Sequence, residues 1–278
     1  MNLILIPIYN DWKSLNKLLI TINRNINHQT PTRILVVDDC SQNKIFLENK
    51  KLKKIKKIEI LRLKRNVGSQ KAIAIGLNYL LKKKKEFDYV TVMDGDGEDN
   101  PSEIEKMLRL AKKNKDSVIV SCRKDRNENF LIKILYKVHL LITVLFTWKW
   151  ITFGNFSVLF RKNLNKILSN QNIWKAYSAS LIKNTNIKRV YAVRSKRFYG
   201  KSQVNLMFLA LHSLRIISVF YLRVIFSSLI YSIILYSNNF IYNEIIILII
   251  VLFNIIIMIL IILNQKKIDL PFIVKKIK

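Results

Sequence analysis

Short apolar runs alternate with amphipathic segments along the first 123 residues, and this alternation limits the folds open to the chain. Each run has the length of a β-strand and is rich in Ile, Leu and Val, as are strands buried on both faces of a sheet. The segments between the runs, including a lysine-rich one after residue 39, are expected to be helices. The expected strands are residues 3–9, 33–39, 58–63, 89–94 and 117–123. This pattern predicts an α/β fold with a mostly parallel, Rossmann-like sheet.

Polar residues occur where these expected strands end. The carboxyl ends of parallel strands meet at one edge of a sheet, and such sheets bind their ligands beyond that edge. We therefore expect the residues at the strand ends to share one site. They are Asp38, Asp39, Asn66, Asp94, Asp96 and Arg123.

The segment DGDGED at residues 94–99 is the strongest candidate within that site. Its glycines remove side-chain bulk and let the backbone bend, so that Asp94, Asp96 and Glu98 can face one cavity. Carboxylates packed together without a partner repel one another and take up protons. Mg²⁺ or Mn²⁺ would relieve that repulsion, because both ions prefer oxygen ligands and need few carboxylates when substrate phosphates supply the rest. The alternatives are a solvated acidic turn and a calcium loop, although the EF-hand spacing is absent.

The charge of the chain narrows its partners. It has 48 Lys and Arg against 18 Asp and Glu, which favours a polyanionic partner such as nucleic acid, anionic lipid or a phosphate-rich substrate. No base-reading module is recognisable, so we expect no nucleic-acid partner. The alternative explanation of the lysine excess is an overall composition biased toward Ile, Asn and Lys. Cys40 and Cys122 lack metal-type spacing, which indicates reduced thiols on a cytosolic face. The first ten residues have no basic leader or cleavage site, which favours a cytoplasmic N-terminus.

Two apolar runs near the C-terminus each have about the 20 residues needed to cross a bilayer. They are residues 216–236 and 244–263, and only SNNFIYN lies between them. Basic residues precede the first run and follow the second. This predicts a multi-pass protein of the inner (cytoplasmic) membrane with both termini in the cytoplasm. Two buried core helices are the alternative. Residues 130–148 carry lysines within an apolar stripe, which favours an interfacial helix over a spanning one.

Five segments follow the order and spacing of the family 2 glycosyltransferases of the GT-A fold, which this chain resembles. They are ILIPIYNDWKSL, ILVVDDCSQN, NVGSQKAIAIGL, VTVMDGDGEDNPSEI and VIVSCRKDR. Downstream, FGNFSVLFRK and RFYGKSQVNLMFLALH resemble segments of the polyprenyl-phosphate branch, which includes the dolichyl-phosphate mannose synthases. The resemblance covers residues 2–220 and implies a GT-A domain over residues 1–205, followed by a membrane region over residues 206–278.

The resemblance implies roles for residues at matched positions. The donor nucleotide pocket would comprise Pro7, Tyr9, Asp38, Asp39, Asn66, Gly68, Gln70 and Asp94. The reaction centre would comprise Asp94, Asp96 and Asp99, with Asp96 and Glu98 as ligands of Mg²⁺ or Mn²⁺. The residues implied to contact phosphate or acceptor are Arg123, Asn155, Arg197, Lys201 and Ser202. Asp38 and Asp99 each have an alternative role as helix caps.

The chain departs from the branch at four positions. Asn155 stands where the branch has Asp, Ser157 where it has Arg, Glu98 where many relatives have Gln, and Gln203 where Lys is usual. The first two departures put the acceptor-phosphate contact and the sugar selectivity in doubt, and the third adds negative charge.

The activity implied by the resemblance is inverting transfer of a sugar from a UDP- or GDP-linked donor to polyprenyl phosphate. A hydroxyl acceptor needs a base to take its proton, whereas a phosphate acceptor is already an anion, and the chain offers no clear base. The alternatives are transfer to a lipid-linked saccharide or another envelope glycan, a non-catalytic membrane scaffold of the same fold, and a basic nucleic-acid binder. A homo-oligomer stays open.

Overall fold

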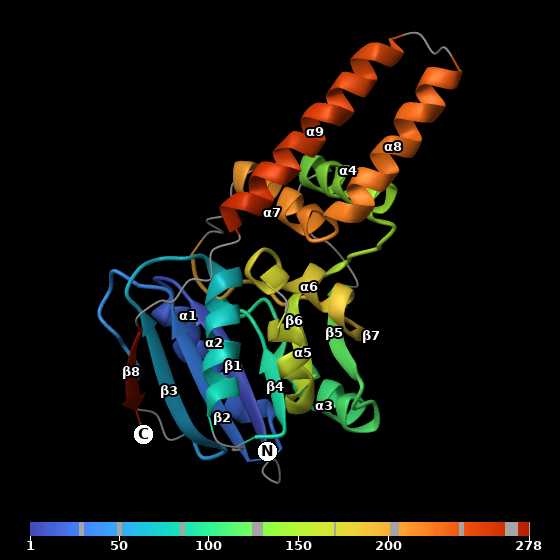
Figure 1. The fold of residues 1–278 in the computed structure, drawn as a ribbon. Coiled ribbons are helices and arrows are strands. Elements are labelled where there is room, and N and C mark those ends of the chain that lie inside the picture. Colours follow the sequence, from blue (N-terminus) through green and yellow to red (C-terminus); the bar gives the residue numbers. More distant parts are fainter. Residues whose placement is uncertain are drawn as a thin grey trace.

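The structure is a computed structural model that describes residues 1–27, 31–48, 52–83, 87–123, 130–169, 171–200, 206–238, 242–264 and 272–277 (Figure 1). Its sheet has eight strands in the order β7-β5-β6-β4-β1-β2-β3-β8. The strands are β1 (Asn2–Ile8), β2 (Thr32–Asp38), β3 (Ile55–Leu63), β4 (Tyr89–Val92), β5 (Ser117–Arg123), β6 (Phe153–Phe160), β7 (Asn186–Ala192) and β8 (Phe272–Ile277). The helices are α1 (Trp12–Asn25), α2 (Ser69–Lys82), η1 (Pro101–Glu103), α3 (Ile104–Lys113), α4 (Phe130–Thr147), η2 (Arg161–Asn163), α5 (Leu164–Ser169), η3 (Gln171–Trp174), α6 (Tyr177–Asn184), α7 (Leu206–Ser218), α8 (Tyr221–Ser237) and α9 (Asn243–Asn264).

The centre of the sheet is parallel and its flanks are mixed. Strands β4, β1, β2 and β3 pair in parallel, which confirms the predicted α/β fold and mostly parallel sheet. Strand β6 lies antiparallel between β4 and β5, so β5 does not join β4 directly as a simple doubly wound sheet would require. Strand β7 extends this side in parallel with β5, and β8 pairs antiparallel with β3 at the other edge.

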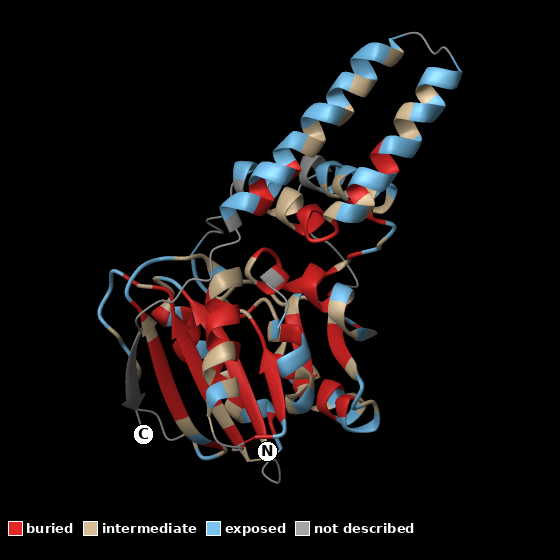
Figure 2. Ribbon diagram, in the orientation of Figure 1, coloured by how far each residue is buried: buried red, intermediate tan, exposed pale blue. Residues whose placement is uncertain are grey.

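The central strands are buried on both faces, as their continuous apolar sequences predict (Figure 2). In β1, Leu3 and Leu5 face the core formed with α2, α5 and α6. The alternate residues Ile4 and Ile6 face the core formed with α1 and α3. Because successive side chains of a strand point to opposite faces, one apolar run serves both layers.

The lysine-rich segment after β2, which the sequence predicts to be helical, contains no helix in its described residues 41–48 and 52–54. The buried side chain of Asn16 on α1 explains the extended course of this segment. Its Nδ2 donates to the carbonyl of Phe46 at 2.9 Å, and its Oδ1 accepts from the N–H of Glu48 at 2.9 Å. Both backbone groups are therefore satisfied without a helix.

We expect Asn16→Ala to lower the free energy of unfolding by about 2 kcal/mol, because it removes the hydrogen bonds to the partly buried backbone groups of Phe46 and Glu48. Urea unfolding in detergent measures the loss. Asn25→Ala is the matched control, since Asn25 is exposed on the same helix and bonds only to the carbonyl of Thr21 among described residues. Equal losses in the two variants would contradict the role given to Asn16.

Beyond the sheet lies a layer of helices with an apolar exterior. Figure 1 shows α8 and α9 projecting side by side, with α4 and α7 across their base. Figure 2 shows that most of α8 and α9 is exposed. Large exposed apolar side chains on this layer include Leu135, Val138, Leu141 and Leu145 of α4, Leu222, Phe226, Leu229 and Ile233 of α8, and Ile245, Leu248, Leu252 and Ile262 of α9. Apolar surface of this extent is typical of contact with lipid or with another protein.

One helix in the described part of the chain, Asn243–Leu263, is by itself long and apolar enough to cross a bilayer. It coincides with the second predicted span. The prediction of one continuous helix over residues 216–236 is wrong, because the chain bends by 90° between Leu209–Ser218 and Tyr221–Ser237. Those two segments meet the criteria of a span only as a bent pair.

Tertiary contacts explain the bend. Val219 and Phe220, which lie between α7 and α8, are buried against Ala176 and the neighbouring α6. The ammonium of Lys183 on α6 donates to the carbonyl of Val219 at 2.7 Å and so satisfies a group that the broken helix leaves open. Just after the bend, Arg223 donates to the carbonyl of Thr147 in α4 at 3.1 Å. The bend thus attaches the helical layer to the sheet domain.

Candidate active site

A cavity of about 900 Å³ lies beyond the carboxyl edge of the central strands. It is bounded by the segment after β1, the acidic segment after β4, the start of β6, the segment after β7 and one face of α7. The lining residues used below are Tyr9, Asp11, Ser69, Gln70, Asp94, Asp96, Glu98, Asn155, Arg194, Arg197, Leu209 and His212. Of the strand-end residues expected to share one site, Asp94 and Asp96 line this cavity; both follow β4, so convergence of residues from different strands stays a prediction.

Glycine makes the acidic segment possible at two positions. Gly95 packs against β1, where a Cβ atom would lie 2.6 Å from Cγ2 of Ile8. Gly97 has φ +87°, and a Cβ there would lie 2.3 Å from the ring of Phe198. The backbone can therefore turn sharply only with glycine at these places.

Two carboxylates close this segment on itself. Asp99 Oδ2 accepts from the N–H of Asp94 at 2.9 Å, and Asp96 Oδ1 accepts from the N–H of Glu98 at 3.0 Å. The cap of η1 is Asn100, whose side chain accepts from the N–H of Ser102, so the alternative role of Asp99 as a helix cap is wrong. Asp99 instead fixes the position of Asp94.

A row of amide side chains orients Asp94. Asn155 Nδ2 donates to Asp94 Oδ1 at 2.9 Å, and Gln70 Nε2 donates to Asn155 Oδ1 at 3.0 Å. Gln70 Oε1 in turn accepts from the N–H of Tyr177 at 2.8 Å. An aspartate at position 155 could not donate to Asp94 and would repel it, so the asparagine is suited to this chain's own network.

Ser157, the other departure near Asn155, lies away from the cavity. Its hydroxyl is buried, donates to the carbonyl of Asn155 at 2.9 Å and lies 2.7 Å from the hydroxyl of Tyr177. Burial raises the pKa of Tyr177, which is therefore a neutral partner at physiological pH. Position 157 thus supports β6 from within the core.

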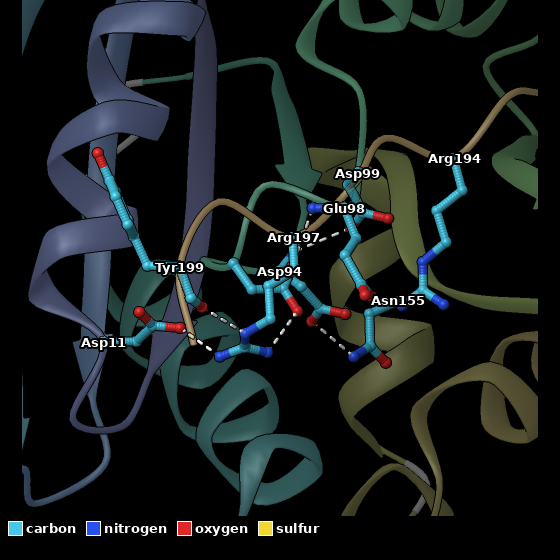
Figure 3. A network of polar contacts seen from close by, with 9 residues as sticks. Asp11, Asp94, Glu98, Asp99, Asn155, Arg194, Arg197 and Tyr199 are labelled. Atoms are coloured by element: carbon cyan, nitrogen blue, oxygen red, sulfur yellow. Dashed lines mark hydrogen bonds and ion pairs between the residues drawn. The ribbon is translucent and has the colours of Figure 1, made fainter. Parts of the chain in front are cut away.

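Two arginines from residues 193–200, here called the arginine segment, pair with the acidic segment (Figure 3). Arg197 lies between two carboxylates, with Nη1 3.1 Å from Asp96 Oδ2 and Nη2 2.5 Å from Asp11 Oδ2. Arg194 forms an ion pair with Glu98. Backbone bonds from Phe198 N–H to the carbonyl of Asp96 and from Ser195 N–H to that of Glu98 hold the two segments together.

The sequence indicated Arg197 but not the pairing, and it did not single out Asp11 or Arg194 as site residues. Asp11 lies three residues after the end of β1 and immediately before α1, and its side chain makes no cap bond to that helix. Its place at a strand end was the signal available. Arg194 lies three residues before Arg197 in the same basic segment and had no distinguishing mark.

The residues expected to bind the donor nucleotide either line the cavity or do not. Tyr9, Gln70 and Asp94 line the cavity. Asp38 is fully buried, accepts from the N–H of Ser41 at 2.9 Å and pairs with Arg62, and no helix follows it to be capped in the described residues. The others, which lie nearby but are not among the lining residues of the described chain, are Pro7, Asp39, Asn66 and Gly68. Their roles stay predictions.

Asp39 organises the turn that begins α2. Its carboxylate accepts from the N–H groups of Val67 and Gly68, both at 2.8 Å. Burial raises the pKa of Asp39 from 3.8 to about 6, although the two N–H donors oppose the shift. The folded protein therefore binds more protons than the unfolded chain between about pH 4 and pH 6, and its stability falls as the pH rises through that window.

We expect Asp39→Asn to remove that fall, which amounts to about 3 kcal/mol over the whole titration and to about 2 kcal/mol of it between pH 4.5 and pH 7.5. The measurement is the free energy of unfolding of wild type and variant at pH 4.5 and pH 7.5. A variant whose stability changes with pH as much as that of the wild type would contradict the shift. Asp116→Asn, at an exposed site, is the control.

Three expected acceptor contacts are not described as side chains. Lys201 and Ser202 lie outside the described residues. Arg123 ends β5, but its side chain is outside the description. These contacts stay predictions.

The sequence matches Glycosyl transferase family 2 over residues 3–184. The chain belongs to this family. This glycosyltransferase has no match among curated proteins. Its fold is similar to that of two solved structures, which share too little sequence with it to indicate more than the fold.

The first is Staphylococcus aureus TarS 1-349 in complex with UDP-GlcNAc, with 18% identity and a TM-score of 0.52 over 82% of this chain and 69% of that one. The second is glucosyl-3-phosphoglycerate synthase from Mycobacterium tuberculosis in complex with Mn²⁺, UDP-glucose and phosphoglyceric acid, with 13% identity and a TM-score of 0.54 over 81% of this chain and 79% of that one. Together they confirm a GT-A-like architecture.

The acidic segment of this glycosyltransferase fits a divalent ion only if a bound substrate supplies further ligands. Within the described residues, no group of three or more His, Cys, Asp or Glu side chains is placed to hold a metal ion. Asp96 and Glu98 offer two carboxylates at one cavity wall, and donor phosphates commonly complete the coordination of Mg²⁺ or Mn²⁺. Both carboxylates are paired with arginines, so a cation would have to replace those ion pairs.

Proposed function

We propose that this family 2 glycosyltransferase is membrane-anchored and moves a sugar from a UDP- or GDP-linked donor to polyprenyl phosphate at the cytoplasmic face. The observation that carries the proposal is the position of the cavity. Asp94 and Asp96 line one side of it and Leu209 and His212 of α7 line another. Because α7 belongs to the layer with the apolar exterior, a lipid could present its headgroup to the carboxylates.

The donor's diphosphate would lie against the acidic segment. Asp96 and Glu98 would hold Mg²⁺ or Mn²⁺, which supplies positive charge to the leaving phosphate. Two solved structures of similar fold contain UDP-sugars, and one of them contains Mn²⁺, which supports this assignment. Arg194 and Arg197, once displaced from the carboxylates by the ion, would pair with phosphate oxygens.

The reaction would be a single displacement. An oxygen of the lipid phosphate attacks the anomeric carbon, the bond from that carbon to the donor's β-phosphate oxygen breaks, and the nucleoside diphosphate leaves. No proton needs to be removed from such an acceptor. A hydroxyl acceptor would need a base, and Asp99 is a poor one because its carboxylate accepts from the backbone of Asp94.

The course of the C-terminal helices supports anchoring with both termini on one side. Strand β8 pairs with β3, so the chain returns to the sheet domain after α8 and α9. A helical hairpin that enters the membrane and returns fits this path. A polar contact joins the two helices, because Asn254 Nδ2 on α9 donates to the hydroxyl of Ser228 on α8 at 2.8 Å, although Oδ1 of Asn254 is buried without a partner among the described residues.

The test is a panel of nucleotide sugars with purified protein, polyprenyl phosphate and Mn²⁺ or Mg²⁺. The proposal predicts a labelled lipid that survives mild alkali and is cleaved by mild acid, as a phosphate-linked sugar is. An acid-stable glycoside would assign a hydroxyl acceptor instead. The absence of any product across the panel would favour a non-catalytic scaffold.

A further inference from the structure

The junction of α2 and α7 concentrates positive charge that the proposed donor site does not use. Lys71 lies in the first turn of α2, and Arg215 lies on α7. In the described chain neither forms an ion pair with a carboxylate, and Nε of Arg215 is buried without a hydrogen-bond partner. Charged donors left in this state are costly unless an anion is bound.

The two side chains belong to one electrostatic site. Burial lowers the pKa of Lys71, and the neighbouring charges of Arg215 and Arg65 lower it further. The charges of Arg215 on α7 and of Arg65, in the segment before α2, therefore act on Lys71 in the first turn of α2. Repulsion of this kind favours binding of an anion that all three can share.

The N-terminus of α2 adds to the same field. Its cap, Gly68, has no side chain, and its first turn contains no acidic residue. The unpaired N–H groups and the helix dipole place partial positive charge there. Ser69 and Gln70 of this turn line the cavity, so the charge faces the space that the acidic segment also lines.

The same junction is bordered by apolar surface. Leu209 and His212 of α7 line the cavity, and His212 and Arg215 are three residues apart and share a helix face. Leu206, Met207 and Leu211 on the same helix are exposed. An anion at this place would carry its apolar part along α7, which favours a lipid headgroup over a free phosphate.

We propose that Lys71, Arg215 and the N-terminus of α2 bind the phosphate of the acceptor lipid, with His212 at the edge between that phosphate and the cavity. The assignment rests on the proposed function and names a site for its acceptor. Lys71 and Arg215 are not themselves among the lining residues of the cavity in the described chain, so the phosphate would reach the donor's sugar past the wall formed by Ser69, Gln70 and His212.

The experiment measures equilibrium binding of a short-chain polyprenyl phosphate, and of the matching polyprenol, to the full-length protein in detergent. We expect Arg215→Gln and Lys71→Gln each to weaken binding of the phosphate form about 10- to 100-fold, the range for loss of one charge-assisted contact. Arg215→Lys, which keeps the charge, should lose less. Arg109→Gln on the exposed face of α3 is the matched control and should bind as wild type does.

Further measurements distinguish a lipid phosphate from free phosphate as the ligand, and distinguish failure of the acceptor site from failure of the proposed function. Calorimetry of UDP or GDP with Mn²⁺ should be unchanged in the Arg215 and Lys71 variants; a loss there would assign the cluster to the donor and overturn the inference. Displacement of the lipid by inorganic phosphate at equal concentration would overturn it in favour of a free-phosphate site. Unaltered lipid binding in both variants would overturn the site and leave the proposed function intact. A wild type that binds polyprenol as well as polyprenyl phosphate would overturn both.

Discussion

Asparagine in place of Asp96 is expected to lower kcat/KM for sugar transfer about 1,000-fold or more, the largest effect that we predict for one substitution. A bound divalent ion contributes several kcal/mol to the stabilisation of the leaving phosphate, and each 1.36 kcal/mol is worth a factor of ten. The neutral amide is a weaker ligand for a hard cation than the carboxylate that it replaces. Initial rates with Mn²⁺ and saturating polyprenyl phosphate measure the loss.

Asp116→Asn is the matched control, because Asp116 is exposed in the turn before β5. Since Asp96 also accepts from the N–H of Glu98 and pairs with Arg197, the folded state of Asp96→Asn needs to be checked by its unfolding midpoint. A folded variant that retains a tenth or more of wild-type activity would contradict the role of Asp96 as a metal ligand.

Glutamine in place of Arg197 is expected to change two quantities in opposite directions. Without nucleotide, the affinity for Mn²⁺ should rise about tenfold, because the cation no longer competes with a guanidinium for Asp96. The kcat/KM should fall by about 100-fold, because a charged contact to phosphate is lost. Electron paramagnetic resonance of free Mn²⁺ measures the first quantity and initial rates measure the second.

Lys196→Gln removes an exposed charge from the same segment and should change neither quantity by more than about twofold. A rise in Mn²⁺ affinity together with a fall in kcat/KM would show that Arg197 competes with the ion for Asp96, whereas loss of structure would lower both. A variant that loses Mn²⁺ affinity and activity together would show that Arg197 supports the acidic segment rather than competing with the ion.

The sheet and the acidic segment could be predicted from the sequence because both depend on local pattern. Apolar runs of strand length marked all five expected strands, and carboxylates after the fourth run marked the cavity wall. The insertion of β6 between β4 and β5 could not be predicted in this way, because its partners are set by pairing across a long stretch of chain.

The failures elsewhere have the same cause. The segment near Phe46 is extended because Asn16 supplies its hydrogen bonds from another element. The bend before α8 arises where Phe220 packs on α6, although the local sequence is mostly apolar on both sides of it. The ion pairs of Arg194 and Arg197 join segments about one hundred residues apart. Local sequence propensity does not predict such long-range contacts.

The most direct test of the central claim is a structure of the protein with Mn²⁺ and UDP or GDP, with anomalous data for the metal. We expect a manganese peak at about 2.2 Å from a carboxylate oxygen of Asp96, bridged to the diphosphate, with the guanidinium of Arg197 moved from Asp96 onto a phosphate. A nucleotide bound without a peak there, and with Arg197 still paired to Asp96, would contradict the claim.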